Sequence, residues 1–155
     1  MPVQSPVEVG AIIEVGPGPE HSTKFRAADS ISANYLANDN GDWDFSAFKG
    51  PVKVRLTIAT PGVVFYRGAS KNALSFADDP AQPKDAVASG HHQFPEDVQH
   101  VSGQSMWFMY RNAWDGGAGD GAKRCEKSAY GVYFSDDEGT FLHHHDPVIQ
   151  NGGCN

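Results

Sequence analysis

Alternation of apolar and polar residues is clearest in the segment VKVRLTIA, residues 52–59, where every second residue is apolar and the residues between are polar or charged. Because successive side chains of a strand point to opposite faces, this period of two predicts a strand with one buried and one wet face. The run VEVGAIIEV at 7–15 is largely β-branched and is ended by GPGP, which predicts a second strand followed by a turn.

Three further segments favour strands. GVVFYRG at 62–68 follows the turn signal TPG. The aromatic run SMWFMYRNAW at 105–114 predicts a strand buried on both faces, with Trp114 at its end. The C-terminal segment 130–149 reads as a β-hairpin: Tyr130, Val132 and Phe134 face one way, residues 136–139 turn the chain, and residues 140–149 return.

Two segments are less regular. Residues 22–37 lack Gly and Pro and carry apolar residues at helical spacing, with Ser22 as an N-cap, although Ile31, Asn34 and Tyr35 would also suit a strand. Residues 77–100 contain three prolines and few large apolar residues, which predicts a long surface loop with one helical turn at most.

Six or seven short strands at this spacing predict an all-β protein, an antiparallel β-sandwich of jelly-roll or immunoglobulin-like type with little helix. The expected core consists of Val9, Ile12, Val52, Val54, Leu56, Ile58, Val64, Phe65, Trp107, Phe108, Tyr130, Val132, Phe134 and Ile149.

Length, composition and net charge restrict the number of domains, the fold class and the partners. A length of 155 residues suits a single domain covering 1–155, and 17 Gly with 10 Pro argue for many turns and against a helix bundle. The net charge of −7 leaves no basic excess for a nucleic-acid backbone, and no apolar stretch approaches the roughly 18 residues of a membrane span.

The first twenty residues lack a basic leader followed by an apolar stretch, so we expect a cytoplasmic protein without a secretory signal. In that compartment Cys125 and Cys154 are expected as two thiols, with a bridge between them as the alternative.

Histidines form two clusters, His91 with His92 and His143 with His144 and His145. In a strand, His143 and His145 would share a face, and a third ligand from His91, His92 or a carboxylate would complete a zinc or copper site. The alternative is that these histidines are polar strand and loop residues, or that the run of three binds metal adventitiously.

Oxygen-bearing side chains alternate through the segment 38–44, at Asn38, Asn40, Asp42 and Asp44, as in the first half of a calcium loop. An EF-hand is excluded because Trp43 occupies the sixth place and Lys49 the twelfth. A looser calcium site would use Asp39, Asp42 or Asp44 with Asp115 and Asp120; the alternative is a solvated turn.

A carbohydrate-binding site would use the same Asn and Asp side chains together with tryptophans. Sugar faces stack on exposed tryptophans, and Asp, Asn and backbone amides of loops bind the hydroxyls. The expected ligand-binding residues are therefore Asn38, Asn40, Asp42, Trp43, Asp44, Trp114, Asp115 and Asp120. Alternatively, each tryptophan simply covers an end of the core.

Enzymatic chemistry has little support. The sequence has no GxSxG elbow, no HExxH and no Walker loop, and no base is placed beside Cys125. We expect a protein that is not an enzyme.

The C-terminal hairpin resembles the signature of the bacterial inclusion-body protein family that includes PixA and AidA. The residues that carry the resemblance, about 20 positions, are Tyr130, Tyr133, Phe134, Asp136, Gly139, Asp146, Pro147 and Ile149. The chain departs from the family at His145, where an aromatic residue is usual. The resemblance implies a compact β-sandwich, self-association and, for some members, sugar binding with calcium.

These observations lead to one hypothesis and two alternatives. The first is a non-enzymatic, lectin-like protein that binds carbohydrate through its Asp/Asn/Gly loops, with calcium as a candidate cofactor. The alternatives are a cupin-like or cupredoxin-like metal protein using His143 and His145, and a purely structural, self-assembling protein.

Overall fold

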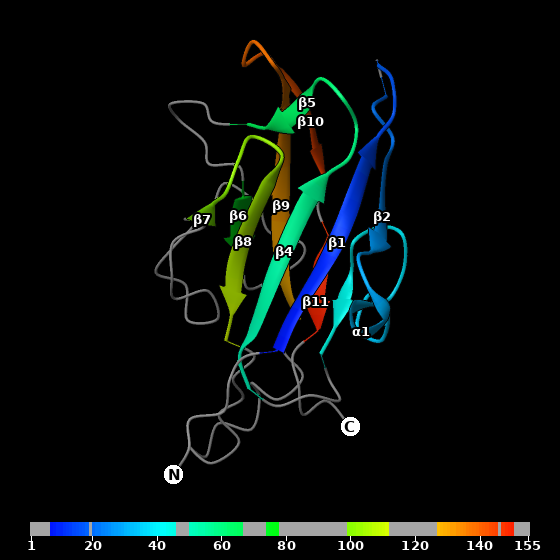
Figure 1. Ribbon diagram of the computed structural model, residues 1–155, viewed down its shortest axis with the longest axis vertical. Coiled ribbons are helices and arrows are strands. Elements are labelled where there is room, and N and C mark those ends of the chain that lie inside the picture. The colour runs from blue at the N-terminus through cyan, green and yellow to red at the C-terminus, as the bar shows by residue number, and fades with distance from the viewer. Residues whose placement is uncertain are drawn as a thin grey trace.

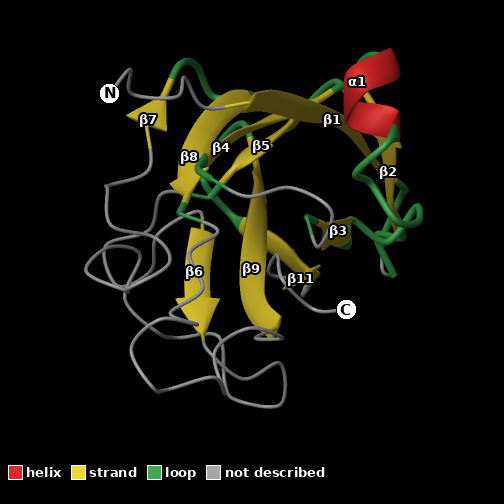
Figure 2. Cartoon of the chain, turned by 90° about the horizontal axis from the view of Figure 1, so that it is seen from below, coloured by secondary structure: helices red, strands yellow, loops and turns green. Residues whose placement is uncertain are grey.

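The computed structural model describes residues 7–18, 20–45, 50–66, 74–77, 99–111, 127–145 and 147–150. Strands dominate this part of the chain, and its single helix, α1 (Ser30–Ala33), is one turn long. The strands form two sheets that lie as two layers, with the core between them (Figures 1 and 2). The prediction of an all-β protein with little helix is therefore confirmed, and the finer assignment to a β-sandwich of jelly-roll or immunoglobulin-like type stays a prediction.

Sheet A has five strands in the order β2-β1-β4-β8-β7. Their bounds are β1 Val7–Val15, β2 Thr23–Ala27, β4 Val52–Ile58, β7 Gln99–His100 and β8 Ser105–Tyr110.

Sheet B is built around one long strand, β9 (Lys127–Asp136). On one side β9 pairs with β10 and β11, and β11 continues to β3; on the other side it pairs with β5 and β6. The bounds of these strands are β3 Trp43–Asp44, β5 Val63–Phe65, β6 Leu74–Ala77, β10 Phe141–His145 and β11 Val148–Gln150.

Strand pairing is mixed rather than antiparallel throughout. The central strands β1 and β4 run parallel, with Val7 opposite Val52 and Ile13 opposite Ile58. The short strands β11 and β3 are also parallel. A parallel pair needs a long crossover, and here residues 16–51, which include β2, α1 and β3, form it.

The core follows the period of two. In β4 every second side chain, from Val52 to Ile58, is buried. Contacts cross between the layers where Phe108 of β8 lies 5.7 Å from Tyr130 of β9, measured between ring centroids. Most of the predicted core is buried, at Val9, Val52, Val54, Leu56, Ile58, Phe65, Phe108, Tyr130, Val132, Phe134 and Ile149.

Three predicted core residues lie elsewhere. Ile12, Val64 and Trp107 are only half-buried, because in each strand the neighbouring residues of opposite parity point into the core. In β8, for example, Met106, Phe108 and Tyr110 are buried while Trp107 is not, so this strand is not fully buried on both faces as predicted.

Residues 22–37 resolve into a strand, a turn and the single helical turn α1. A helix capped at Ser22 is therefore wrong: Thr23–Ala27 is β2, and the N-cap of α1 is Asp29. The Asp29 carboxylate accepts a hydrogen bond of 2.8 Å from the Ser32 amide. That backbone bond, together with one from the Ser32 side chain, lowers the pKa of Asp29 below its usual value.

The predicted C-terminal hairpin is present as β9 and β10, joined by a turn in which Asp136 Oδ1 accepts hydrogen bonds from the amides of Glu138 and Thr140. The return strand is divided at Pro147 into β10 and β11. Most of the predicted loop 77–100, and both cysteines, lie outside the described residues, and β6 was not predicted. None of the described helices is long and apolar enough to cross a membrane.

Candidate functional site

The loop 38–42 is held by its own side chains. Asn38 Oδ1 accepts hydrogen bonds from the amides of Asn40 (2.9 Å) and Asp42 (3.4 Å), and Asn38 Nδ2 donates to Asp42 Oδ2 (3.0 Å). The other carboxylate oxygen of Asp42 accepts from the Val148 amide at 2.8 Å. Both Asp42 oxygens therefore serve the fold: Oδ2 bonds within the loop, and Oδ1 ties the loop to β11.

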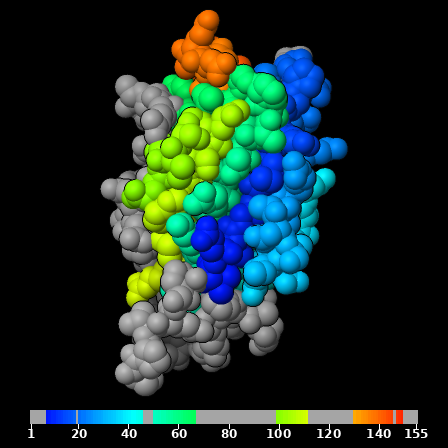
Figure 3. Space-filling view, viewed as in Figure 1, coloured from blue at the N-terminus to red at the C-terminus, as the bar shows by residue number. Residues whose placement is uncertain are grey.

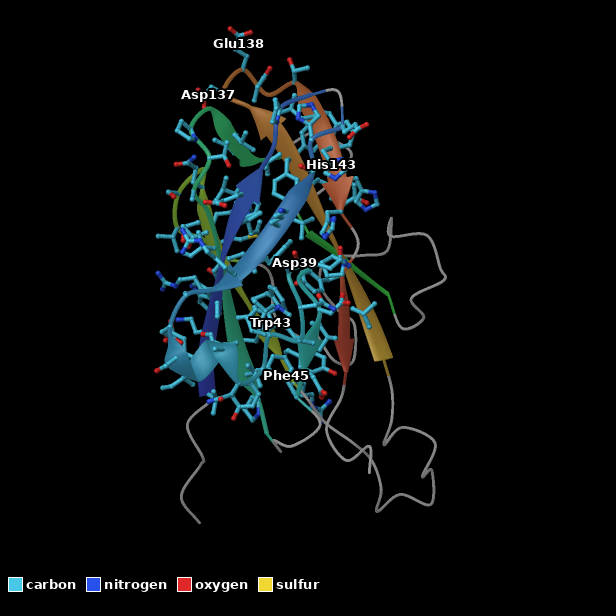
Figure 4. All side chains as sticks on the ribbon, turned by 90° about the vertical axis from the view of Figure 1, so that its right-hand side faces the viewer. Asp39, Trp43, Phe45, Asp137, Glu138 and His143 are labelled. Carbon is cyan, nitrogen blue, oxygen red and sulfur yellow. The ribbon has the colours of Figure 1, made fainter. Side chains whose placement is uncertain are left out.

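The next residue, Trp43, lies between the layers (Figure 4) and is 1% exposed. Its indole nitrogen donates to the Tyr130 hydroxyl, which in turn donates to the backbone oxygen of Gly41. Burial raises the pKa of Tyr130 well above its usual value. This buried chain of hydrogen bonds connects the loop to the centre of β9.

These contacts correct the role expected of Trp43. Trp43 is not an exposed stacking surface for a sugar, because its ring fills the core beside Phe45, 5.8 Å away between centroids. Asn38, Asn40 and Asp44 are exposed, but the oxygens of Asn38 and Asp42 already accept hydrogen bonds within the loop. Trp114, Asp115 and Asp120 lie outside the described residues.

The three histidines of β10 point to alternate faces, as predicted. A β-bulge at Leu142 shifts the register, so that His143 lies opposite Phe134 and His145 opposite Val132, both buried residues. His144 turns to the other face and stacks on Tyr133, with ring centroids 4.2 Å apart. His143 and His145 therefore share the face that points toward sheet A.

At this edge the two layers meet through histidine and phenylalanine rings. His145 stacks on Phe25 of β2 at 5.5 Å, and its Nε2 lies 2.7 Å from the backbone oxygen of Asn40. His143 lies 6.4 Å from His21, which follows β1, and 6.3 Å from His145, again between ring centroids. The His143–His145 pair thus helps to close the edge between β2 and β10.

A metal centre needs further ligands. No group of three or more His, Cys, Asp or Glu residues lies in a metal-binding arrangement among the residues that the structure describes. His91 and His92, the proposed additional ligands, lie outside those residues, so the transition-metal hypothesis stays a prediction.

A different surface emerges on the outer face of sheet A, which Figure 3 views directly. One row of residues crosses its strands: Gly10 of β1 is opposite Arg55 of β4, which is opposite Trp107 of β8, which is opposite Gln99 of β7. Trp107 is partly exposed, and Lys53 Nζ lies 4.2 Å from the centroid of its ring.

A shallow pocket of about 270 Å³ opens at the β1 end of this row, lined by Glu8, Val9, Gly10, Ala28, Asp29 and Arg55. Gly10 has no side chain to fill it, and a Cβ there would lie 3.3 Å from the Arg55 backbone oxygen and 3.4 Å from Ala28 Cβ. Arg55 Nε lies 3.7 Å from Glu8 Oε1 and has no hydrogen-bond partner among the described residues.

We call this surface, comprising Glu8, Gly10, Lys53, Arg55 and Trp107, the sheet A patch. Sequence reasoning missed it because Trp107 stood within a dense aromatic run and was assigned to the core. The signal was nevertheless present: if Phe108 and Tyr110 face inward, the period of two directs Trp107 to the face that carries Lys53 and Arg55.

No protein-family model matches this chain, and neither a curated protein nor a solved structure matches it significantly. The resemblance to the PixA and AidA family therefore stays a prediction.

Proposed function

We propose that the protein is a non-enzymatic, lectin-like module that binds carbohydrate on the sheet A patch. This proposal keeps the ligand class expected from the sequence and moves its site from the loop 38–44 to the outer face of sheet A. The observation that carries it is the partly exposed Trp107 beside two cations, one of which, Arg55, also lines a pocket on its other side.

Trp107 supplies the stacking surface. The C–H face of a pyranose ring packs well on an indole, which combines a large apolar area with few rotatable bonds. Trp107 lies on a strand paired on both sides, so its backbone is held rigidly before a ligand arrives. Such preorganisation favours binding because less conformational entropy is lost.

Polar groups beside the indole suit sugar hydroxyls. The Arg55 guanidinium donates hydrogen bonds and the Glu8 carboxylate accepts them, so a pair of neighbouring hydroxyls has a partner of each kind. The pocket at Gly10 lies next to these groups and provides room for a hydroxyl or hydroxymethyl group.

Calcium has no role in this arrangement. The calcium site expected from the sequence would use Asp39, Asp42 or Asp44 with Asp115 and Asp120. The Asp42 oxygens accept hydrogen bonds from Val148 and Asn38, and Asp115 and Asp120 lie outside the described residues. We therefore expect binding at the sheet A patch to be independent of calcium.

The test is a glycan array probed with the purified protein, once with calcium and once with chelator. We expect the same glycans to bind in both conditions and Trp107→Ala to abolish the signal. Phe141→Ala is the matched control, since Phe141 is an exposed aromatic residue, 45% accessible, on the other sheet. Absence of binding across a broad array in both conditions would refute the proposal, and so would full binding by a folded Trp107→Ala variant.

A further inference from the structure

We infer that the sugar bound at the sheet A patch carries a carboxylate, as a uronic acid does. This inference rests on the proposed function and specifies its ligand class. It comes from the position of Lys53, from the donors of Arg55 and from the distribution of charge over the described residues.

Lys53 stands over the ring that a sugar would use. Its ammonium nitrogen lies 4.2 Å from the Trp107 centroid, a cation–π contact. A sugar that stacks on the same ring face must displace this ammonium. A neutral sugar would leave Lys53 without compensation for the lost contact, whereas a carboxylate at the edge of the sugar ring would bind it as an ion pair. The contact therefore selects for an acidic ligand.

Arg55 adds a second cation on the neighbouring position of the same strand face. Its side chain is 42% exposed, and Nε has no hydrogen-bond partner among the described residues. The fork of a guanidinium matches the two oxygens of a carboxylate. Glu8 lies opposite Lys53 in the β1–β4 register and 3.7 Å from Arg55, and Asp29 lines the pocket together with Arg55. A carboxylate of the ligand would therefore bind on the Lys53 and Trp107 side of Arg55 rather than in the pocket.

On the outer face of sheet A the described cations outnumber the described carboxylates by four to three. The described lysine and arginine side chains are those of Lys24, Arg26, Lys53, Arg55 and Arg111, and all but Arg111 lie on the outer face of sheet A. Two carboxylates, those of Glu8 and Glu14, stand opposite Lys53 and Lys24, and Asp29 lies at the pocket.

The other described carboxylates lie elsewhere. Asp39, Asp42 and Asp44 belong to the segment before β4, and Asp137 and Glu138 project from the β9–β10 turn (Figure 4). With a net charge of −7, the chain as a whole repels polyanions, so an acidic glycan would be steered to the one described face where cations are concentrated.

The experiment is affinity electrophoresis through gels that contain polygalacturonate, neutral galactan or polyglutamate. We expect polygalacturonate to retard the wild-type protein most strongly, with an affinity at least about tenfold above that for galactan, as one charge-assisted contact would give. Added salt should reduce the difference.

Single substitutions test the roles of Lys53 and Trp107 separately. Lys53→Met keeps the apolar stem over Trp107 but removes the ammonium that a neutral sugar would displace. It should weaken binding to polygalacturonate about tenfold and should not weaken any binding to galactan. Trp107→Ala should abolish both. Arg26→Gln is the control, because Arg26 is an exposed cation of the same face opposite Ile12 rather than beside Trp107.

The outcomes are distinguishable. Equal binding of galactan and polygalacturonate, both lost in Trp107→Ala, would overturn the inference and leave the proposed function standing. Retardation by polyglutamate as strong as by polygalacturonate would also overturn it, because the patch would then recognise negative charge alone. Binding of no glycan in any gel or on the array would remove both proposals.

Discussion

Trp43 and Tyr130 are joined by a hydrogen bond of 3.1 Å from the indole nitrogen to the phenolic oxygen, across 87 positions of the chain. Both side chains are buried, and the Tyr130 hydroxyl donates a hydrogen bond to the backbone oxygen of Gly41. We predict that Tyr130→Phe destabilises the protein by about 1–3 kcal/mol, because it leaves the buried indole N–H without an acceptor and the Gly41 oxygen without this donor. Urea unfolding measures the change; Tyr66→Phe, at a half-buried tyrosine, is the control. An unchanged midpoint for Tyr130→Phe would show that water replaces the lost bond.

We predict that alkaline pH destabilises the protein through the same residue, Tyr130. Its pKa in the folded protein is raised by burial, so the folded state holds its proton more tightly than the unfolded state does. Stability from this group is therefore complete below the ordinary tyrosine pKa of about 10 and is lost as pH rises above it. Melting temperatures recorded from pH 8 upward should fall more steeply for wild type than for Tyr130→Phe. Parallel curves would contradict the prediction.

Two glycines with nearly the same positive φ form a matched pair. Gly41 has φ of 89° and Gly139 has φ of 87°, but a Cβ at Gly41 would lie 2.9 Å from atoms of the Phe25 ring, whereas a Cβ at Gly139 meets nothing within 4 Å. Gly139→Ala should therefore cost only the conformational term, about 1–2 kcal/mol. Gly41→Ala should cost about 1–3 kcal/mol more, because Phe25 must move. Thermal unfolding of both variants tests this difference. Equal losses of stability would show that the Phe25 ring moves aside at no cost.

Leu56 and Ile12 lie on neighbouring strands of sheet A and face opposite ways. Leu56 is 0% exposed, whereas Ile12 is half-buried on the outer face. Leu56→Ala should destabilise by about 2–5 kcal/mol through the cavity it leaves. Ile12→Ala should cost only about 1 kcal/mol. Chemical denaturation of the two proteins compares them directly, and a larger loss at Ile12 would reverse the facing of β1.

Asp42 links the loop 38–42 to β11, and its two oxygens have different partners. Asp42→Ala should cost about 1–3 kcal/mol by leaving the Val148 amide and the Asn38 side chain without their acceptor. Asp42→Asn retains an oxygen that can accept from Val148 and should recover part of the loss. Amide hydrogen exchange at Val148 reports the bond itself. Asp137→Ala, at an exposed turn position, serves as the control and should leave exchange at Val148 unaltered.

Much of the fold was predictable because strand patterns are local. The alternation in 52–58 identifies β4 and its buried face from adjacent residues alone, and the hairpin turn at 136–139 is marked by Asp136 and Gly139. Where two apolar residues adjoin, as at Ile12 and Ile13, the pattern does not choose between them, and the structure buries Ile13. The parallel pairing of β1 with β4 joins segments about 45 positions apart, and no pattern within either segment indicates which strand it pairs with.

The candidate site was less predictable for the same reason. Oxygen-rich spacing at 38–44 suggested ligands, but the partners of Asp42 and Trp43 come from Val148 and Tyr130, far along the chain. The shared face of His143 and His145 followed from strand geometry and is confirmed. Which face they share depends on the bulge. Trp107 was wrongly assigned to the core because both its neighbours in the chain are apolar, so the sequence does not show which face of β8 it occupies.

The bulge at Leu142 determines which of the three histidines face the core. If Leu142 paired with Phe134 in a regular ladder, each later residue of β10 would move one step along β9, so His144 would point inward and its two neighbours outward. Deletion of Leu142 would instead remove the bulge and leave His143 opposite Phe134, so both inward imidazoles would be retained. A strand with this order of residues therefore places two imidazoles rather than one between the layers only because one residue stays out of the ladder.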